Sequence, residues 1–165
     1  MNYTYDTFAT PLGDFSVALH ASGAVAATAF GGLRALRARL GQGHLELDRA
    51  RAEPVRREID EYFAGRRRKF TVKLAPAGTP FQQAIWQALR QIPYGQTVSY
   101  GEVAATAGKP TASRAVGRAN ATNPICLLIP CHRVIGSDGS LTGYAFGEDV
   151  KWALLELEKP GSAKA

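Results

Sequence analysis

Hydrophobic positions in the first third of the chain come in short runs separated by turn residues, and this pattern predicts β-strands. Residues 4–8, 14–19 and 24–30 are rich in β-branched and aromatic side chains, and Pro-Leu-Gly and Ser-Gly turns divide them. Leu33–Leu40 is expected to form a short helix. The chain is therefore predicted to begin with three strands and a helix.

A second and better-defined helix is predicted after Pro54, because proline suits a first helical turn. Its apolar positions recur at helical spacing. They are Val55, Ile59, Tyr62 and Phe63. Gly65 would end this helix, and residues 70–74 are expected to form one more strand.

The Ala-Pro-Ala-Gly segment at residues 75–78 is typical of a linker, and the pattern changes from strands to helices after it. No internal repeat or low-complexity tract is evident. We therefore expect an N-terminal α/β domain over residues 1–75, a linker over 76–80 and a C-terminal domain over 81–165.

Helix-initiating residues recur in the second half of the chain. Thr79 is placed to cap a helix with Pro80 at its first position, and Ser99 and Glu102 have the spacing of a capping box. The first of these helices has an apolar stripe formed by Phe81, Ile85, Leu89 and Ile92. A further helix is expected to start at Thr111 or Ser113 and to run to about residue 120.

The two short helices on either side of Gly108 and Pro110 resemble a helix-turn-helix, a motif that binds DNA. Between residues 96 and 135 a single acid, Glu102, stands against several basic residues. These are Lys109, Arg114, Arg118 and Arg133. The later helix is rich in Ala and Gly, so it is slim enough to approach a groove. Alternatively, its small residues pack it tightly against its own core, and both readings can hold because a helix has two faces.

The chain as a whole is basic, since its 165 residues carry a formal net charge of +6. This charge favours an anionic partner, with nucleic acid as the first candidate. The basic run at residues 66–69 is interpreted as a solvated turn. The N-terminus lacks the pattern of a secretory signal, and no apolar run is long enough to span a bilayer. A cytoplasmic location without membrane contact is therefore expected.

The cysteines supply the candidate chemistry. Cys126 and Cys131 are too few to form a structural zinc site, which needs about four Cys or His ligands, so no metal is expected. A disulfide between them is not expected in a cytosolic chain. Cys131 directly precedes His132, and a thiol beside a histidine suggests a nucleophile and its base. The alternative is a buried structural cysteine beside a hydrogen-bonded histidine, and a structural role is the one we favour for Cys126.

Residues 127–135 place Cys131, His132 and Arg133 between two apolar blocks, which predicts a buried, strand-like setting. Successive side chains on a strand point to opposite faces, so direct contact between the thiol and the imidazole is not assured. A bridging water or a turn at this point would bring them together.

This segment, Pro130-Cys131-His132-Arg133-Val134, resembles the active-site signature of the 6-O-alkylguanine-DNA alkyltransferases, or methylated-DNA–protein-cysteine methyltransferases. The resemblance covers residues 79–158 and extends to the segments 81–86, 92–100, 113–117, 120–124 and 141–144. Residues before it fit the family's smaller, variable domain only in the order of their elements.

The resemblance implies an α+β fold. A small ribonuclease H-like N-terminal α/β domain would precede a helical C-terminal domain that is winged helix-turn-helix-like. The activity implied is DNA repair by direct, irreversible and stoichiometric transfer of an alkyl group, mainly methyl, from 6-O-alkylguanine in double-stranded DNA to Cys131. The protein would act as a monomer and without a cofactor.

The resemblance also implies roles for the residues of a catalytic site. Cys131 is similar to the alkyl acceptor, His132 to a base that works through a water, and Glu158 to the carboxylate that orients it. Asn123 resembles a hinge before the active-site segment. Tyr100 resembles the residue that displaces the target phosphate and protonates the departing guanine.

Two further sets of residues follow from the resemblance. Arg114 is similar to the finger that fills the space left by a flipped base. The DNA-binding set consists of Arg114, Tyr100, Ala112, Ser113, Gly117 and Arg118. The pocket for the substrate base is formed by Tyr144, Val134, Ala145, Phe146 and Cys131.

Phe146 departs from the family pattern, because many relatives have glycine at this position. We expect a tighter pocket that accepts methylguanine and excludes benzylguanine. The N-terminal cysteines of the family's zinc-binding form are absent. Two other classes of function stay open: a non-enzymatic helix-turn-helix or lesion-sensing module, although sensors of this kind lack the cysteine, and a cysteine hydrolase, whose nucleophile usually starts a helix.

Overall fold

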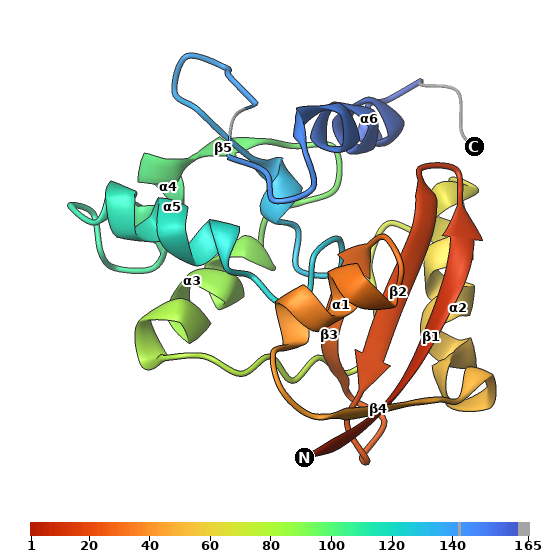
Figure 1. The fold of residues 1–165 in the computed structure, drawn as a ribbon. Helices are drawn as coiled ribbons and strands as arrows, with labels where there is room; N and C mark the ends of the chain where they lie inside the picture. The colour runs from red at the N-terminus through yellow and green to blue at the C-terminus, as the bar shows by residue number, and fades with distance from the viewer. Residues whose placement is uncertain (142, 162–165) are drawn as a thin grey trace. The chain divides into compact units, whose positions relative to one another are not determined.

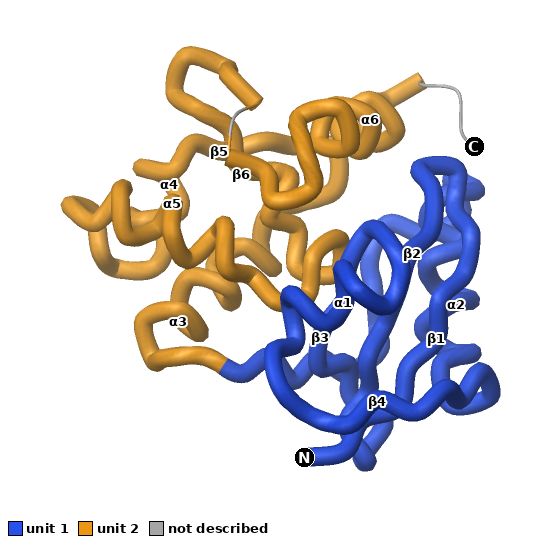
Figure 2. Tube along the Cα trace, in the orientation of Figure 1, with its two compact units in different colours: residues 1–77, 163–165 blue, residues 78–162 orange. Residues whose placement is uncertain are grey.

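The computed structural model describes residues 1–141 and 143–161 and has an α+β fold. Its contacts separate two compact units, which among the described residues are unit 1, Met1–Ala77, and unit 2, residues 78–161 (Figure 2). This division falls inside the segment 76–80, for which the sequence suggests a linker. No helix in the described part of the chain is long and apolar enough to cross a membrane.

Unit 1 is built on a four-stranded sheet with the order β3-β2-β1-β4 (Figure 1). The strands β1 (Asn2–Thr10), β2 (Gly13–Leu19) and β3 (Val25–Phe30) pair antiparallel, which confirms the three predicted strands. Phe15 and Phe30 are paired across β2 and β3, and their ring centroids lie 4.9 Å apart. Burial of these rings, with the valines and alanines beside them, forms the core of this unit.

The short strand β4 (His44–Leu47) pairs parallel to β1 and was missed by the sequence reading. Its four residues, His-Leu-Glu-Leu, are too few and too exposed to form a clear hydrophobic pattern. Strand β4 is held instead by the ladder to the N-terminal half of β1.

Helix α1 (Leu33–Leu40) is confirmed, whereas the predicted start of the next helix is wrong. Helix α2 (Arg49–Phe63) begins five residues before Pro54, and the side chain of Asp48 caps it by accepting a hydrogen bond from the backbone of Arg51. Pro54 therefore lies inside the helix, past its first turn, and not at its first position. The capping signal of Asp48 was the better guide to the start of the helix.

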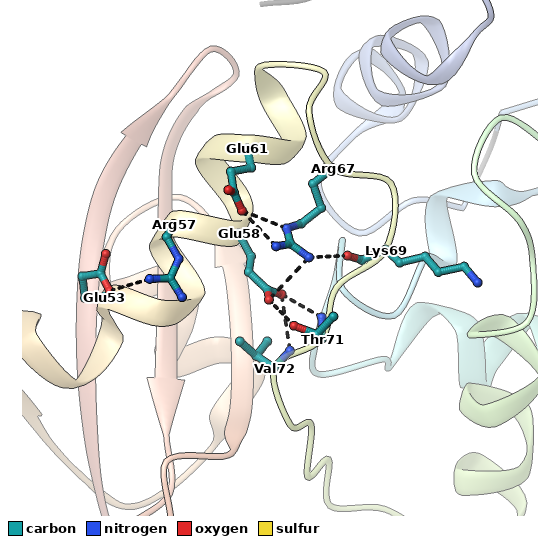
Figure 3. Close-up of polar contacts among 8 residues, drawn as sticks. All are labelled: Glu53, Arg57, Glu58, Glu61, Arg67, Lys69, Thr71 and Val72. Carbon is teal, nitrogen blue, oxygen red and sulfur yellow. Dashed lines mark hydrogen bonds and ion pairs between the residues drawn. The ribbon is translucent and has the colours of Figure 1, made fainter.

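The predicted strand at residues 70–74 is also wrong, because only Leu74 forms a β-bridge, with Val25. The backbone N–H groups of Thr71 and Val72 donate instead to the buried carboxylate of Glu58, at 2.8 and 3.3 Å (Figure 3). The hydroxyl of Thr71 donates to the same carboxylate. The side chain of Glu58 thus accepts hydrogen bonds from backbone N–H groups that would otherwise pair with a neighbouring strand.

The basic run at residues 66–69 is not uniformly solvated. Arg66, Arg68 and Lys69 are exposed, but Arg67 folds back onto helix α2. Its guanidinium lies 3.0 Å from Glu61 and 3.5 Å from Glu58 (Figure 3). The interpretation as a solvated turn is therefore wrong for Arg67, because two acids on α2 lie within reach of it.

Unit 2 is mainly helical. Its elements are α3 (Pro80–Leu89), β5 (Val98–Ser99), α4 (Tyr100–Thr106), α5 (Ser113–Ala121), the 3-10 turn η1 (Cys131–Arg133), β6 (Val134–Ile135) and α6 (Glu148–Glu158). Strands β5 and β6 pair parallel. The capping boxes of α3 and α4 are confirmed, with both reciprocal hydrogen bonds present in each. Helix α5 starts at Ser113, one of the two predicted starts, and its N-cap is Ala112.

Trp86 joins α3 to α5 in the core of unit 2. Its ring is almost fully buried, and Nε1 donates to the backbone oxygen of Ala119 at 2.8 Å. Gly78 lies against the same ring, since a Cβ there would come within 2.5 Å of it. Val116 on α5 and Ile85 on α3 are fully buried beside these groups. The core thereby fixes the position of α5 and of the chain that follows it.

Candidate active site

Cys131 lies in a tight turn. It begins the 3-10 turn η1, where the backbone N–H of Arg133 donates to the oxygen of Pro130 at 3.0 Å. The strand-like setting expected for this residue is therefore wrong, and strand β6 begins only at Val134. Cys126 and Cys131 are both buried and are not joined by a disulfide.

Asparagine side chains anchor the segment that leads to this turn. Asn123 is fully buried, and its Nδ2 donates to the oxygen of Ile129 while its Oδ1 accepts from the backbone of Ile125, both at 3.0 Å. Asn120, in the last turn of α5, donates to the backbone oxygen of Cys131 at 3.4 Å. Asn120 begins the segment 120–124 that resembles the family, but no role was expected for it.

His132 and Glu158 are brought together from η1 and the end of α6. His132 is fully buried, and its Nε2 lies 2.8 Å from Oε2 of Glu158. Burial lowers the pKa of His132, and the hydrogen bond to Glu158 opposes this only in part. Nδ1, on the other side of the ring, is buried and has no hydrogen-bond partner among the described residues. A neutral ring with Nε2–H directed at Glu158 leaves the lone pair of Nδ1 as the basic position.

Arg133 completes this network and was not among the expected site residues. Its guanidinium donates from Nε to Oε1 of Glu158 at 2.8 Å and from Nη2 to Oε2 at 3.0 Å. Burial by itself raises the pKa of Glu158, but the hydrogen bonds from His132 and Arg133 outweigh it and hold that pKa far below its usual range. The carboxylate is therefore ionised throughout the physiological pH range.

Lys151 is a second site residue that the sequence reading missed. It is fully buried on α6, two helical turns before Glu158 and hence on the same face. Burial lowers the pKa of Lys151, and negative charge on Cys131 and Glu148 opposes this shift. Its spacing from Glu158 was the signal that could have identified it.

Tyr100 lies near the same cysteine. It is the first residue of α4, and burial raises the pKa of its phenol, with a further contribution from negative charge on Cys131. Gly143 lies close to this side chain, since a Cβ there would come within 3.1 Å of the phenol oxygen. The structure thus gathers a thiol, a phenol, an imidazole and a buried ammonium around one turn.

Helix α5 has one face packed in the core and one exposed face. Val116, Ala119 and Asn120 are buried. The basic side chains Arg114 and Arg118 are exposed, and they line a hollow of about 520 Å³ at the start of the helix. Ala112 and Ser113 line the same hollow. Nothing lies within 4 Å of a Cβ built on Gly117, so this part of the helix surface is open.

The residues expected to form the base pocket are partly brought together. The rings of Tyr144 and Phe146 meet edge to face, with centroids 5.8 Å apart. Tyr144 and Val134 are buried, whereas Ala145 is exposed. Thr142, in the segment that resembles the family before Tyr144, lies outside the described residues. Within residues 1–141 and 143–161, no group of three or more His, Cys, Asp or Glu side chains is arranged to hold a metal ion.

Comparison with known proteins places this site in a defined context. Residues 80–160 match the model of the family described as 6-O-methylguanine DNA methyltransferase, DNA binding domain. A methylated-DNA–protein-cysteine methyltransferase of Methanosarcina acetivorans is 59% identical over 102 residues, which are 62% of this chain and 65% of that relative. The match thus spans just under two thirds of the relative's length. One of Mycobacterium leprae is 54% identical over 71% of this chain and 70% of its own.

The fold is also shared with solved structures. The Mycobacterium tuberculosis OGT crystallised in complex with DNA superposes with a TM-score of 0.86 at 41% identity, over 96% of this chain and 94% of that one. A methyltransferase from Methanococcus jannaschii gives a TM-score of 0.68 at 22% identity over 97% and 96% of the two chains, a likeness of fold alone.

Proposed function

Because the chain belongs to the 6-O-methylguanine DNA methyltransferase family, we propose that it repairs DNA by moving an alkyl group, mainly methyl, from 6-O-alkylguanine to Cys131. The observation that carries this proposal is the arrangement around η1. The thiol of Cys131 is followed by a buried imidazole whose Nε2 is bound to Glu158 and whose Nδ1 is left as a base.

In the proposed reaction Nδ1 of His132 takes the proton of the Cys131 thiol, directly or through one water. The thiolate attacks the alkyl carbon in line, so that a carbon–sulfur bond forms as the bond from carbon to the guanine oxygen breaks. Tyr100 donates a proton to the departing guanine and later regains one from His132. The product is a thioether with no hydrolytic exit, so each molecule reacts once.

The target base must leave the duplex before the thiol can reach it, at a cost of a few kcal/mol. We propose that α5 contacts DNA through its exposed face and that Arg114 fills the space left by the flipped base. Arg118, Ser113 and the open surface at Ala112 and Gly117 would contact the backbone around it. Binding through phosphates is expected to weaken strongly as salt rises.

The flipped base would lie against Tyr144 and Phe146, with Val134, Ala145 and Cys131 completing its pocket. We further propose that unit 1 is ribonuclease H-like and that α4, α5 and the β5–β6 pair form a winged helix-turn-helix-like domain. The protein would act as a monomer and without a cofactor. The mixed sheet of unit 1 and the short connection between α4 and α5 support this description of the fold.

The proposal is tested with duplex DNA that carries 6-O-methylguanine labelled in its methyl group. The wild type should become labelled in a single turnover, whereas Cys131→Ser should bind the DNA and acquire no label. A DNA-binding or lesion-sensing module would bind without transfer in both forms. A hydrolase would release the label to solvent over many turnovers.

A further inference from the structure

Each of the three nitrogens in the Arg133 guanidinium donates a hydrogen bond. Two of its nitrogens bind the two oxygens of Glu158, and Nη1 donates to the backbone oxygen of Ile92 at 2.8 Å. Its carbon Cζ lies 5.7 Å from the centre of the Tyr94 ring. Only 7% of this side chain is exposed. So many fixed contacts make Arg133 a rigid, buried cation beside the imidazole of His132.

The net charge of the hydrogen-bonded group formed by Arg133, Glu158 and His132 depends on whether His132 is protonated. Arginine stays protonated in proteins, and Glu158 is ionised, so these two side chains cancel each other. A proton added to His132 would then leave a net positive charge in a buried site, which is costly. If Arg133 were absent, the same proton would instead compensate the negative charge of Glu158.

We propose that Arg133 is a positioning residue that reserves His132 as a neutral base by taking up the charge of Glu158. The inference rests on the proposed function, because it assigns the acceptor of the Cys131 proton. The shared oxygen supports it: Oε2 of Glu158 accepts from His132 at 2.8 Å and from Arg133 at 3.0 Å. Glu158 thus fixes the orientation of the imidazole ring. Arg133 balances the negative charge of Glu158, so that this charge does not stabilise a second proton on His132.

Other charged groups around His132 are Glu158 and Lys151 on α6, beside Arg133 in η1. Burial lowers the pKa of His132 most, Glu158 raises it, and the positive charges of Arg133 and Lys151 lower it further. Lys151 therefore acts in the same direction as Arg133. Arg133 acts through direct hydrogen bonds to both oxygens of Glu158, and its removal takes these two charged donors away from the carboxylate.

The test is the pH profile of the single-turnover rate of methyl transfer, measured for the wild type, Arg133→Met and Arg133→Lys. We expect the acid limb of Arg133→Met to move to higher pH by about one unit, which corresponds to about tenfold in protonation of the base. The rate at high pH should recover to within a few-fold of the wild type. Arg133→Lys keeps a positive charge, so its acid limb should lie between those of the wild type and Arg133→Met. The control Arg90→Met, at an exposed position, should leave the pH profile unchanged.

A lower rate at every pH with an unmoved acid limb would show a merely structural role and overturn the inference. A wild type that transfers no methyl group would instead contradict the proposed function. Nitrogen-15 NMR of the histidine rings in the wild type tests the inference even if the variants do not fold. A neutral His132 ring with its proton on Nε2 at pH 7 is expected, and an imidazolium there would overturn the proposal.

Discussion

Asn120 in the last turn of α5 donates from Nδ2 to the backbone oxygen of Cys131, over 3.4 Å. Both residues are buried. The adjacent residue of the helix, Ala119, accepts a hydrogen bond from Trp86, so the core fixes this turn from its other side. The helix proposed to contact DNA is therefore bonded directly to the backbone of the proposed nucleophile.

This link predicts that Asn120 affects transfer more than DNA binding. Asn120→Leu keeps the branched shape of the side chain but removes the donor, so the single-turnover rate should fall about threefold to tenfold, the worth of one hydrogen bond. The affinity for methylguanine DNA, measured in a Cys131→Ser background, should change less than twofold. Ala121→Leu, at the exposed neighbouring position, is the control. Equal losses of rate and affinity would show that Asn120 supports only the helix.

The aromatic contact between Tyr144 and Phe146 predicts resistance to benzylguanine. The phenyl ring of Phe146 would occupy space that a benzyl group needs, so the wild type should be inactivated slowly. Phe146→Gly should be inactivated at least tenfold faster while it retains repair of methylguanine DNA. Residual repair activity after incubation with the free base measures this. Rapid inactivation of the wild type, unchanged in Phe146→Gly, would refute the prediction.

The buried imidazole of His132 predicts loss of stability in mild acid. Burial lowers its pKa in the folded protein below the ordinary value of 6.5, so the unfolded chain binds the proton first as the pH falls. The contribution of this group is fully present above pH 6.5 and is lost as the pH falls through the folded pKa. The free energy of unfolding, measured by urea titration from about pH 7.5 down to about pH 5, should fall. His132→Gln should show a flatter slope, and an equally steep one would contradict this account.

The hydrogen bonds to the carboxylate of Glu58 are expected to contribute strongly to the stability of unit 1. It accepts from the backbone of Thr71 and Val72 and from the hydroxyl of Thr71, and Arg67 lies beside it (Figure 3). Glu58→Gln should lower the free energy of unfolding by about 2 kcal/mol, because buried donors lose a charged acceptor.

The control is Glu53→Gln, in the same helix. Glu53 pairs with Arg57 at 3.8 Å on an exposed surface, so its loss should cost less than about 0.5 kcal/mol. If the two variants lose similar free energies of unfolding, the hydrogen bonds from residues 71 and 72 to Glu58 contribute little to stability.

Local sequence signals predicted the elements that depend on local interactions. The capping boxes of Thr79 and Ser99 are present, because each is closed by side chains three residues apart. Residues 70–74 failed as a strand, since the competing acceptor, Glu58, lies more than ten residues away in sequence. Strand β4 depends on pairing with residues 2–5 of β1, which are distant in sequence. The four mostly exposed residues of β4 give no sign of that pairing.

The candidate site shows the same division. The proximity of His132 and Glu158 followed from a family resemblance, not from spacing, because 26 residues separate them. Arg133 was counted only for its charge, since its partners Ile92 and Glu158 are distant in sequence. The buried state of Lys151 could have been suspected from its helical register with Glu158, but burial itself depends on what packs against α6.

Transfer to Cys131 is seen directly in the mass of the intact protein after reaction with excess DNA containing 6-O-methylguanine. We expect the mass to rise by one CH₂ unit per chain and then to stop, as S–H becomes S–CH₃, and digestion to locate the gain on the peptide with Cys131. An unchanged mass while the lesion disappears, or a methyl group located on Cys126, would contradict this expectation.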